Sequence, residues 1–516
     1  MTAATRSGLA ALGAGLFIGV SGDLLLPAEP WGANVPICVA ALVAAGAWLV
    51  RRSAITSSAD TGWLALSTLL LSAAFLGRDA RLLQVLDILA LVGIFGLAAA
   101  AAIGMELRRA PVERWVAAVA RSAMSTLSGG LQLVFADIAW RDLPVGNRLA
   151  RYRGIALGAL FAAPLLLVFA GLFAAADPVF AQTMGTVLGV DLSSATVHTF
   201  RTCVLGGLAA GYLRGIVLAG GMPLSAAAAE PRLQPRIGES TPAPTSRASD
   251  RATPILTALI LLNALFLLFV AIQLRYFFGG ADRVETVAGL TFAEYARRGF
   301  FELVWASALV VPVLLGADWA VRGASPVGVR RFRIAATVTL GLLTVVMASA
   351  LQRMRLYVAA FGLTEDRLYA TAGMVFLAVV LAWLGWTVLR GHAERFAFGG
   401  TLQGLAVLAG LHALNPDAFV VRHNLDRPGA EQPFDVEYAA SLSADAAPVL
   451  LHALPELTPA DACVAAERLA GWAGRDTDWR TWNWSRARAA RLGRDPLIAA
   501  TQARCDAHAS SLIPSP

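Results

Sequence analysis

The residues best suited to chemistry gather at two places in the second half of the chain. Each place has a Gln, an Arg and a Tyr near the end of an apolar segment, then Gly-Leu-Thr, then another apolar segment. Arginine binds phosphate and carboxylate groups through the planar fork of its guanidinium. One hypothesis is therefore a basic pocket for an anionic group, such as a lipid phosphate, that is built from Arg275, Glu294, Arg297, Arg298, Glu302, Arg353, Arg355, Glu365 and Arg367.

The same residues have a structural interpretation. Charges close to a hydrocarbon layer are costly and are usually paired. Glu294, Arg298 and Glu302 are spaced four apart, so on a helix they share one face and can form ion pairs. Salt bridges that hold loops against a helical bundle therefore remain an alternative to an anion site.

The threonines of the two motifs, Thr291 and Thr364, are suited to capping helices. A threonine hydroxyl accepts from the first free N–H groups of a helix, and Thr291 with Glu294 has the spacing of a capping box. Glu365 and Asp366 would lie in a first turn, where the helix dipole favours acids. The repeated motif also hints at an internal repeat of helix pairs.

The elements that position these motifs are apolar segments of spanning length. Hydrophobic residues make up 57% of the chain and charged residues 15%, with a mean hydropathy of +0.63. A soluble domain carries about 25% charged residues. The sequence predicts an all-α transmembrane bundle of about eleven spans, near 7–27, 31–50, 61–77, 82–104, 154–176, 199–221, 253–274, 299–317, 334–352, 368–390 and 398–413.

Arginine placement predicts the orientation of this bundle. With the N-terminus in the cytoplasm, the inside segments hold 21 arginines and the outside loops hold 10, as the positive-inside trend requires. An odd number of spans then places the tail outside. All 42 basic residues are arginine, which together with the alanine content is typical of a GC-rich bacterium, so the expected location is a bacterial inner membrane.

Composition divides the chain into five parts. Within the first part, residues 105–153 have apolar positions at helical spacing between charges, and we expect helices there. Either they lie on the membrane surface, with Trp115 and Trp140 near the headgroups, or they pack under the bundle. The parts are 1–153 with four spans and this cytoplasmic segment, 154–221 with a helix pair, the flexible cytoplasmic linker 222–252, the five-helix half 253–413, and the helical extracytoplasmic tail 414–516.

Two features of the tail leave alternatives open. Cys463 and Cys505 can form a disulfide in an oxidising compartment, or they can be two unpaired thiols. The tryptophans at 472, 479, 482 and 484 can build a small helical core, or they can dock on a membrane or stack on a ligand.

Charges also occur inside or near the expected spans, at Asp23, Asp87 and Arg214. An ionisable residue in a membrane is a functional candidate by default. Asp23 can also lie simply at the interface, and Arg214 can extend its guanidinium toward the cytoplasm.

Motifs of the common enzyme classes are absent from the sequence. It contains no P-loop, dinucleotide fingerprint, nucleophile elbow or HExxH, and no Cys/His spacing of a metal site. We therefore expect no cofactor, no metal, no nucleic-acid partner and no assignable catalytic residue.

Several blocks resemble one family. They are FAAADPVFA, GLTFAEYARRGFFELV, RMRLYVAAFGLTEDRLYA, NPDAFVVRHNLDR with the later FDVEYAASLSADAAPVLL, and DWRTWNWSRARA, in order from about 150 to 490. They are similar to the bacterial membrane-protein family filed as domain of unknown function 4173, related to 4153. The resemblance implies a multi-spanning protein with an extracytoplasmic tail, and it brings no activity or catalytic residue.

Three functions are compatible with these observations. The first is binding, moving or sensing an anionic amphiphile or envelope component at the outer face. The second is a structural or regulatory subunit that binds membrane-protein partners. The third is an envelope transferase with a lipid-linked donor, in which Glu294, Glu302 and Glu365 would do acid/base work.

Overall fold

The computed structural model describes residues 3–53, 60–102, 105–140, 192–217, 252–277, 300–427, 434–474 and 478–511. Within these ranges the regular elements are all helices. The longer ones are α1 (Ala3–Leu25), α2 (Asn34–Arg52), α3 (Asp60–Ala73), α4 (Arg81–Ala102), α5 (Val112–Gln132), α9 (Leu192–Val217), α12 (Ala252–Phe277), α15 (Phe300–Val321), α16 (Pro326–Phe361), α17 (Glu365–Thr387), α18 (Phe396–Leu414), α19 (Pro416–Leu425), α20 (Val436–Ser441), α21 (Ala447–Ala453), α22 (Pro459–Ala473), α23 (Trp484–Leu492) and α24 (Pro496–Ser511).

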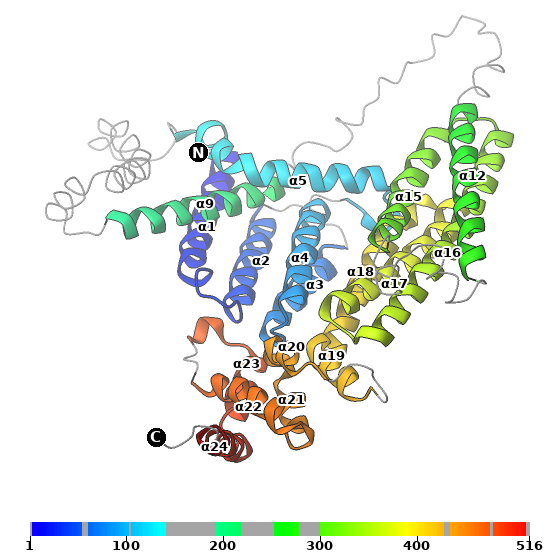
Figure 1. Cartoon of the computed structure of the whole chain (residues 1–516). Helices are drawn as coiled ribbons and strands as arrows, with labels where there is room; N and C mark the ends of the chain where they lie inside the picture. Colours follow the sequence, from blue (N-terminus) through cyan, green and yellow to red (C-terminus); the bar gives the residue numbers. More distant parts are fainter. Residues whose placement is uncertain are drawn as a thin grey trace, which may run out of the picture.

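The helices form two groups and a tail. Figure 1 shows α1 to α4 side by side in one group and α12 with α15 to α18 in the other. Helices α19 to α24 lie together below them, at the end opposite to the N-terminus (Figure 1). The N-terminus and the tail therefore lie at opposite ends of the bundle.

Eight helices in the described residues are long and apolar enough to cross a membrane. The protein is thus a multi-pass membrane protein. Its candidate spans are Thr5–Leu25, Asn34–Arg52, Arg81–Ala102, Ala252–Ala271, Leu303–Val321, Pro326–Phe361, Glu365–Arg390 and Ala393–Leu414.

The predicted count of eleven spans is not established. Segment 154–176 lies outside the described residues, as do Thr291 and all of the linker 222–252 except Ala252. Segment 61–77 is a helix, but Asp60–Leu76 is shorter than the eight candidates. Segment 199–221 overlaps α9, whose arginines, glycines and polar residues lower its hydropathy, and α9 is not among the eight.

Helix α5 crosses the ends of other helices. In Figure 1 it runs across the upper ends of α2 and α4. Its apolar residues Met124, Leu127 and Leu131 are exposed. Trp115, however, is buried among residues of α3 and α4, so its ring packs against protein.

Glycines allow α9 to lie very close to both α1 and α5. A Cβ atom on Gly19 of α1 would lie 2.5 Å from the carbonyl oxygen of Thr202, and one on Gly130 of α5 would lie 2.6 Å from that of Gly207. Small residues at helix contacts are a common means of packing helices in membranes, where backbones must approach closely. These three helices therefore pack through their backbones.

The tail shares its apolar core with the bundle. Leu363 and Leu368, at the junction of α16 and α17, belong to the same buried cluster as Val420, Leu450 and Leu469 of the tail. A disulfide joins Cys463 of α22 to Cys505 of α24. The tail is thus cross-linked internally and packed on the ends of α16 and α17.

Candidate functional site

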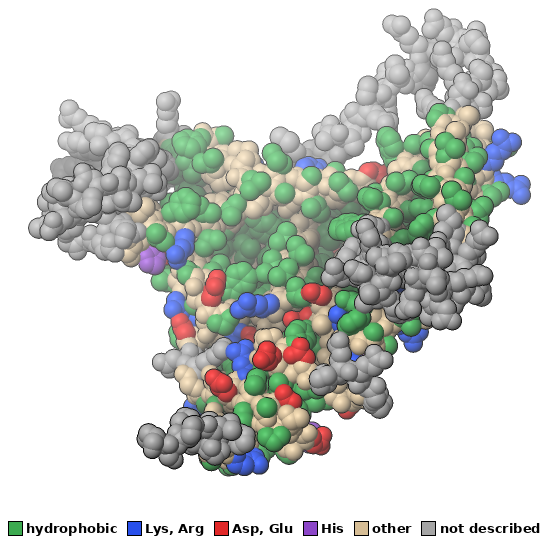
Figure 2. All heavy atoms as spheres, viewed as in Figure 1, with side chains coloured by type: hydrophobic (Ala, Val, Ile, Leu, Met, Phe, Trp, Pro, Cys, Tyr) green, Lys and Arg blue, Asp and Glu red, His purple; other side chains and the backbone are tan. Residues whose placement is uncertain are grey.

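An apolar crevice of about 860 Å³ lies between the two helix groups. Its walls are mostly α4 on one side and α17 and α18 on the other. Figure 2 shows hydrophobic side chains over the hollowed middle of this face, with charged side chains gathered below, toward the tail. Residues that line the crevice include Leu86, Leu89, Phe376, Leu377, Leu405 and Leu408.

Glycines keep this crevice wide. Gly93 of α4, Gly373 of α17 and Gly400 of α18 line it, and a Cβ atom built on any of them meets nothing within 4 Å. The space next to these glycines therefore has room for at least a Cβ atom, and a side chain there would narrow the crevice.

Tyr369 brings polar chemistry to the tail end of the crevice. It lines the crevice and follows Glu365 by one helical turn on α17. The carboxyl groups of Asp417, Glu365, Asp445 and Asp87 all act electrostatically on it. Its hydroxyl is buried without a hydrogen-bond partner among the described residues, and burial of such a group is costly.

Asp87 and His412 join the two helix groups near this end. His412 Nε2 of α18 lies 2.9 Å from Asp87 Oδ1 of α4. The Asp87 side chain is 1% exposed, and its Oδ2 has no hydrogen-bond partner in the described part of the chain. The pair therefore holds α4 and α18 together at the end where the crevice meets the tail.

Asp445 of the tail binds the beginning of α4. Its Oδ2 accepts from the backbone N–H of Asp79 at 2.7 Å and of Ala80 at 3.0 Å. Arg78 lies 3.6 Å from its other oxygen. Free N–H groups and the positive end of a helix dipole favour a carboxylate at such a position, so a tail residue completes the N-terminus of a bundle helix.

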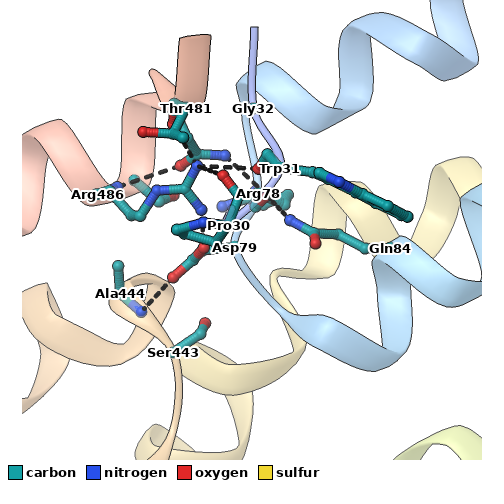
Figure 3. A network of polar contacts seen from close by, with 12 residues as sticks. Pro30, Trp31, Gly32, Arg78, Asp79, Gln84, Ser443, Ala444, Thr481 and Arg486 are labelled. Atoms are coloured by element: carbon teal, nitrogen blue, oxygen red, sulfur yellow. Dashed lines mark hydrogen bonds and ion pairs between the residues drawn. The ribbon is translucent and has the colours of Figure 1, made fainter. Parts of the chain in front are cut away.

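Arg486 holds three segments of the chain together (Figure 3). Its guanidinium forms an ion pair with Asp79 and donates to the carbonyl oxygens of Trp31 at 2.9 Å and Thr481 at 2.5 Å. The Arg486 side chain is 7% exposed. Burial raises the pKa of Asp79, although the charge of Arg486 acts in the opposite direction.

Asn483 of the tail also binds the connection between α3 and α4. Its side-chain N–H groups donate to the carbonyl oxygens of Phe75 at 2.8 Å and Arg78 at 2.9 Å. These carbonyls lie at the C-terminal end of the α3 segment, where helices leave acceptors unsatisfied. The tail therefore satisfies both ends of the α3–α4 connection.

A second group of acids lies where α17 meets the tail. Asp417 accepts from the backbone N–H of Ser443 at 3.1 Å and also from its hydroxyl. Burial raises the pKa of Asp417, and the hydrogen bonds from Ser443 act in the opposite direction. Tyr438 Oη accepts from the backbone N–H of Glu365 at 2.8 Å, and burial raises the pKa of Tyr438.

Residues 65–453 match the family described as Domain of unknown function (DUF4153). The chain belongs to this family. The DUF4153 match includes α4, α17 and α18, which form the crevice walls, and it includes Asp79, Asp417 and Asp445. It ends before α23, which carries Arg486. No curated protein and no solved structure matches the chain.

The cluster predicted from the sequence is only partly described. Thr291, Glu294, Arg297 and Arg298 lie outside the described residues. Arg275 and Glu302 belong to α12 and α15, but their side chains are not described. Arg355 is exposed, whereas Arg353 is half-buried and has a partner.

Arg367 and Thr364 have structural roles at the α16–α17 turn. Arg367 donates to the carbonyl oxygens of Phe361 and Gly362, and its guanidinium lies 4.1 Å from the centroid of the Tyr357 ring. The Thr364 hydroxyl accepts from the backbone N–H of Arg367 at 3.5 Å. Gly362 has a φ of 78°, which favours glycine and lets the chain reverse.

The in-membrane charges noted in the sequence have partners from distant segments. Asp23 lies 2.6 Å from His198 Nδ1, and Arg214 Nε lies 2.5 Å from an Asp137 oxygen. The sequence indicated Asp23, Asp87 and Arg214, but it did not indicate their partners. It also missed Tyr369, Asp79 and Asp445, whose importance comes from contacts between segments hundreds of residues apart.

The described residues do not form a recognisable metal centre. Within them, no group of three or more His, Cys, Asp or Glu side chains is placed to hold a metal ion.

Proposed function

We propose that the protein binds a membrane amphiphile, with the apolar chain in the crevice between α4, α17 and α18. The observation that carries this proposal is the crevice itself. Ligand sites typically measure about 300–1,000 Å³ and are lined mostly by apolar side chains, and this crevice measures about 860 Å³. It lies along helices that are apolar and long enough to span a membrane.

The shape of the crevice fits a long chain. Its α18 wall runs from Phe396 to Leu411, which corresponds to roughly 22 Å of helix. The hydrocarbon core of a bilayer is about 30 Å thick. An acyl or isoprenoid chain that leaves its leaflet can therefore lie along the crevice for most of its length.

The charges at the tail end favour a particular headgroup. The carboxyl groups of Asp417, Glu365, Asp445 and Asp87 act electrostatically on Tyr369, while Arg78 and His412 are paired with Asp445 and Asp87. An anionic head would meet these carboxyl groups there, and both basic side chains already have acidic partners. We infer an uncharged or cationic head with hydrogen-bond donors, in place of the anionic amphiphile of the first hypothesis from the sequence.

We also propose that the tail faces the extracytoplasmic side of a bacterial inner membrane. Arginines are more abundant on the segments that share a side with the N-terminus, as the positive-inside trend predicts. The disulfide between Cys463 and Cys505 supports the same orientation, because disulfides persist in oxidising compartments such as the periplasm.

The crevice can be tested by filling it. Gly373→Leu and Gly400→Leu would place side chains in the open space, and Gly341→Leu is the matched control because Gly341 also meets nothing within 4 Å but does not line the crevice. Protein purified in mild detergent would be extracted with organic solvent, and its bound lipids would be measured by mass spectrometry.

The wild type and Gly341→Leu should retain a bound amphiphile through delipidation, and the two crevice variants should lose most of it. Equal retention by all four proteins would exclude the proposal. If the lipid bound to the wild type were mainly anionic, the proposal that the crevice binds an amphiphile would stand, but the inferred headgroup would be wrong.

A further inference from the structure

Three tryptophans of the tail are exposed within six residues. Trp479, Trp482 and Trp484 have exposed fractions of 64%, 41% and 54%. Trp472, in the same tail, is 5% exposed and belongs to the apolar core. The tail thus uses one tryptophan for its core and presents the other three on its surface.

The exposed tryptophans lie beside the ends of two candidate spans. Figure 1 shows the segment before α23 directly below the ends of α1 and α2. Arg480 donates to the carbonyl oxygen of Leu24, the penultimate residue of α1, at 2.6 Å. The backbone of the tail at Trp482 also packs closely on Gly32, which lies between α1 and α2. A Cβ atom on Gly32 would lie 2.4 Å from the carbonyl oxygen of Trp482.

Helix α1, whose end Arg480 contacts, also carries exposed apolar side chains. Phe17, Val20 and Leu24 of α1 are exposed, with fractions of 65%, 44% and 58%. Four residues separate Val20 from Leu24, so they share one face of the helix. An apolar strip therefore runs down a candidate span and ends where the tail presents its tryptophans.

We propose that Trp479, Trp482 and Trp484 seat the tail in the membrane–water interface, with their rings among the lipid headgroups. Tryptophan is enriched at this depth because its ring is apolar and its N–H needs a polar partner. Arg491 lies over the Trp484 ring, 5.5 Å from its centroid, and its exposed guanidinium can reach lipid phosphates. The tail then rests on the bilayer beside α1 and α2. This inference is independent of the proposed amphiphile.

Hydroxyl-radical footprinting of the unaltered chain tests whether each of these tryptophan rings is shielded from water. The protein would be placed in nanodiscs of phosphatidylethanolamine and phosphatidylglycerol, and the oxidation of each tryptophan would be measured by mass spectrometry. Trp479, Trp482 and Trp484 should be oxidised about as slowly as the buried Trp472. Oxidation several-fold faster than that of Trp472 would place the rings in water, as a surface for a protein partner requires, and would overturn the proposal.

Brominated lipids supply a second readout. Bromine atoms on lipids quench the fluorescence of nearby tryptophans. In the triple variant W479F/W482F/W484F, the quenching of tryptophan fluorescence by bromines near the headgroups should fall relative to wild type. Quenching by bromines near the bilayer centre should not change. W472F is the matched control and should change neither. Unchanged shallow quenching in the triple variant would also overturn the proposal.

Discussion

Arg486 of α23 and Asp79, which precedes α4, form a buried ion pair although 407 positions separate them in the chain. Asp79 also accepts from the backbone N–H of Ala444, and Asp445 in turn accepts from the backbone of Asp79. Tail and bundle therefore bind each other reciprocally. This contact joins the tail to the beginning of α4, apart from the apolar core that the tail shares with the ends of α16 and α17.

Arg486→Gln should loosen the tail where it meets the α3–α4 connection. Removal of one partner of a buried ion pair typically costs about 3–5 kcal/mol, because the other charge stays buried and unpaired. Asp79 is 11% exposed in the pair, so we expect a cost in this range. Limited proteolysis should cut between the bundle and the tail much faster than in wild type.

Arg488→Gln is the matched control, because Arg488 is an exposed arginine on the same helix. It should leave proteolysis unchanged. The ion pair would not hold the tail if both variants were cut at the wild-type rate.

Asp417→Asn should change how stability depends on pH. Burial raises the pKa of Asp417 above its ordinary value of 3.8, so the folded protein holds a proton that the unfolded chain has already lost. The contribution of Asp417 to the free energy of unfolding is therefore full below 3.8 and falls as pH rises through the folded pKa. This contribution to the free energy of unfolding falls by about 1.4 kcal/mol for each unit by which folding raises the pKa of Asp417.

Thermal unfolding in detergent across the acidic range measures this effect. Wild-type Tm should fall relative to that of Asp417→Asn as pH rises, because asparagine does not titrate. Parallel pH profiles for the two proteins would show that Asp417 has its ordinary pKa.

Gly19→Ala should separate α1 from α9. The added Cβ atom would lie 2.5 Å from the Thr202 carbonyl oxygen and 2.8 Å from Gly206, and both contacts are with backbone. Overpacking of this kind costs about 1–3 kcal/mol. Gly13→Ala, whose Cβ atom meets nothing within 4 Å, should keep or slightly raise the Tm. Equal Tm values for the two variants would argue against the close packing.

The double variant C463A/C505A should destabilise the tail. The disulfide closes a loop with a sequence separation of 42, and a loop of that size stabilises by about 4 kcal/mol in the chain-entropy treatment. The Tm of the tail should fall, and Cys203→Ala should not alter it because Cys203 is a free, exposed cysteine. In intact cells, maleimide should label Cys463 and Cys505 only after reduction. Labelling without reductant would contradict the disulfide.

The sequence predicted the helices well because their signal is local. Apolar runs of spanning length predict membrane helices, and segment 398–413 was found within the candidate span Ala393–Leu414. The hydroxyl of Thr364 accepts from the Arg367 N–H, three residues away. A capping residue acts within one turn, so its spacing in the chain is sufficient to recognise it.

The partners of the charged residues could not be predicted in the same way. Asp87 was visible as a charge in an apolar segment, but His412, which binds it, is 325 positions away. From the sequence, Arg367 could either bind an anionic ligand or stabilise the protein itself. Only the folded structure shows that its guanidinium donates to the carbonyl oxygens of Phe361 and Gly362. Long-range pairing depends on how the helices pack.

The sequence by itself determined that this protein is helical, crosses a membrane several times and belongs among families of unknown function. Tertiary structure alone decided that α4, α17 and α18 enclose an apolar crevice and that the tail binds the α3–α4 connection. The physical reason is the distance along the chain over which each interaction acts. Hydropathy and capping act over one to six helical turns, whereas a crevice and a buried ion pair exist only after distant helices have packed.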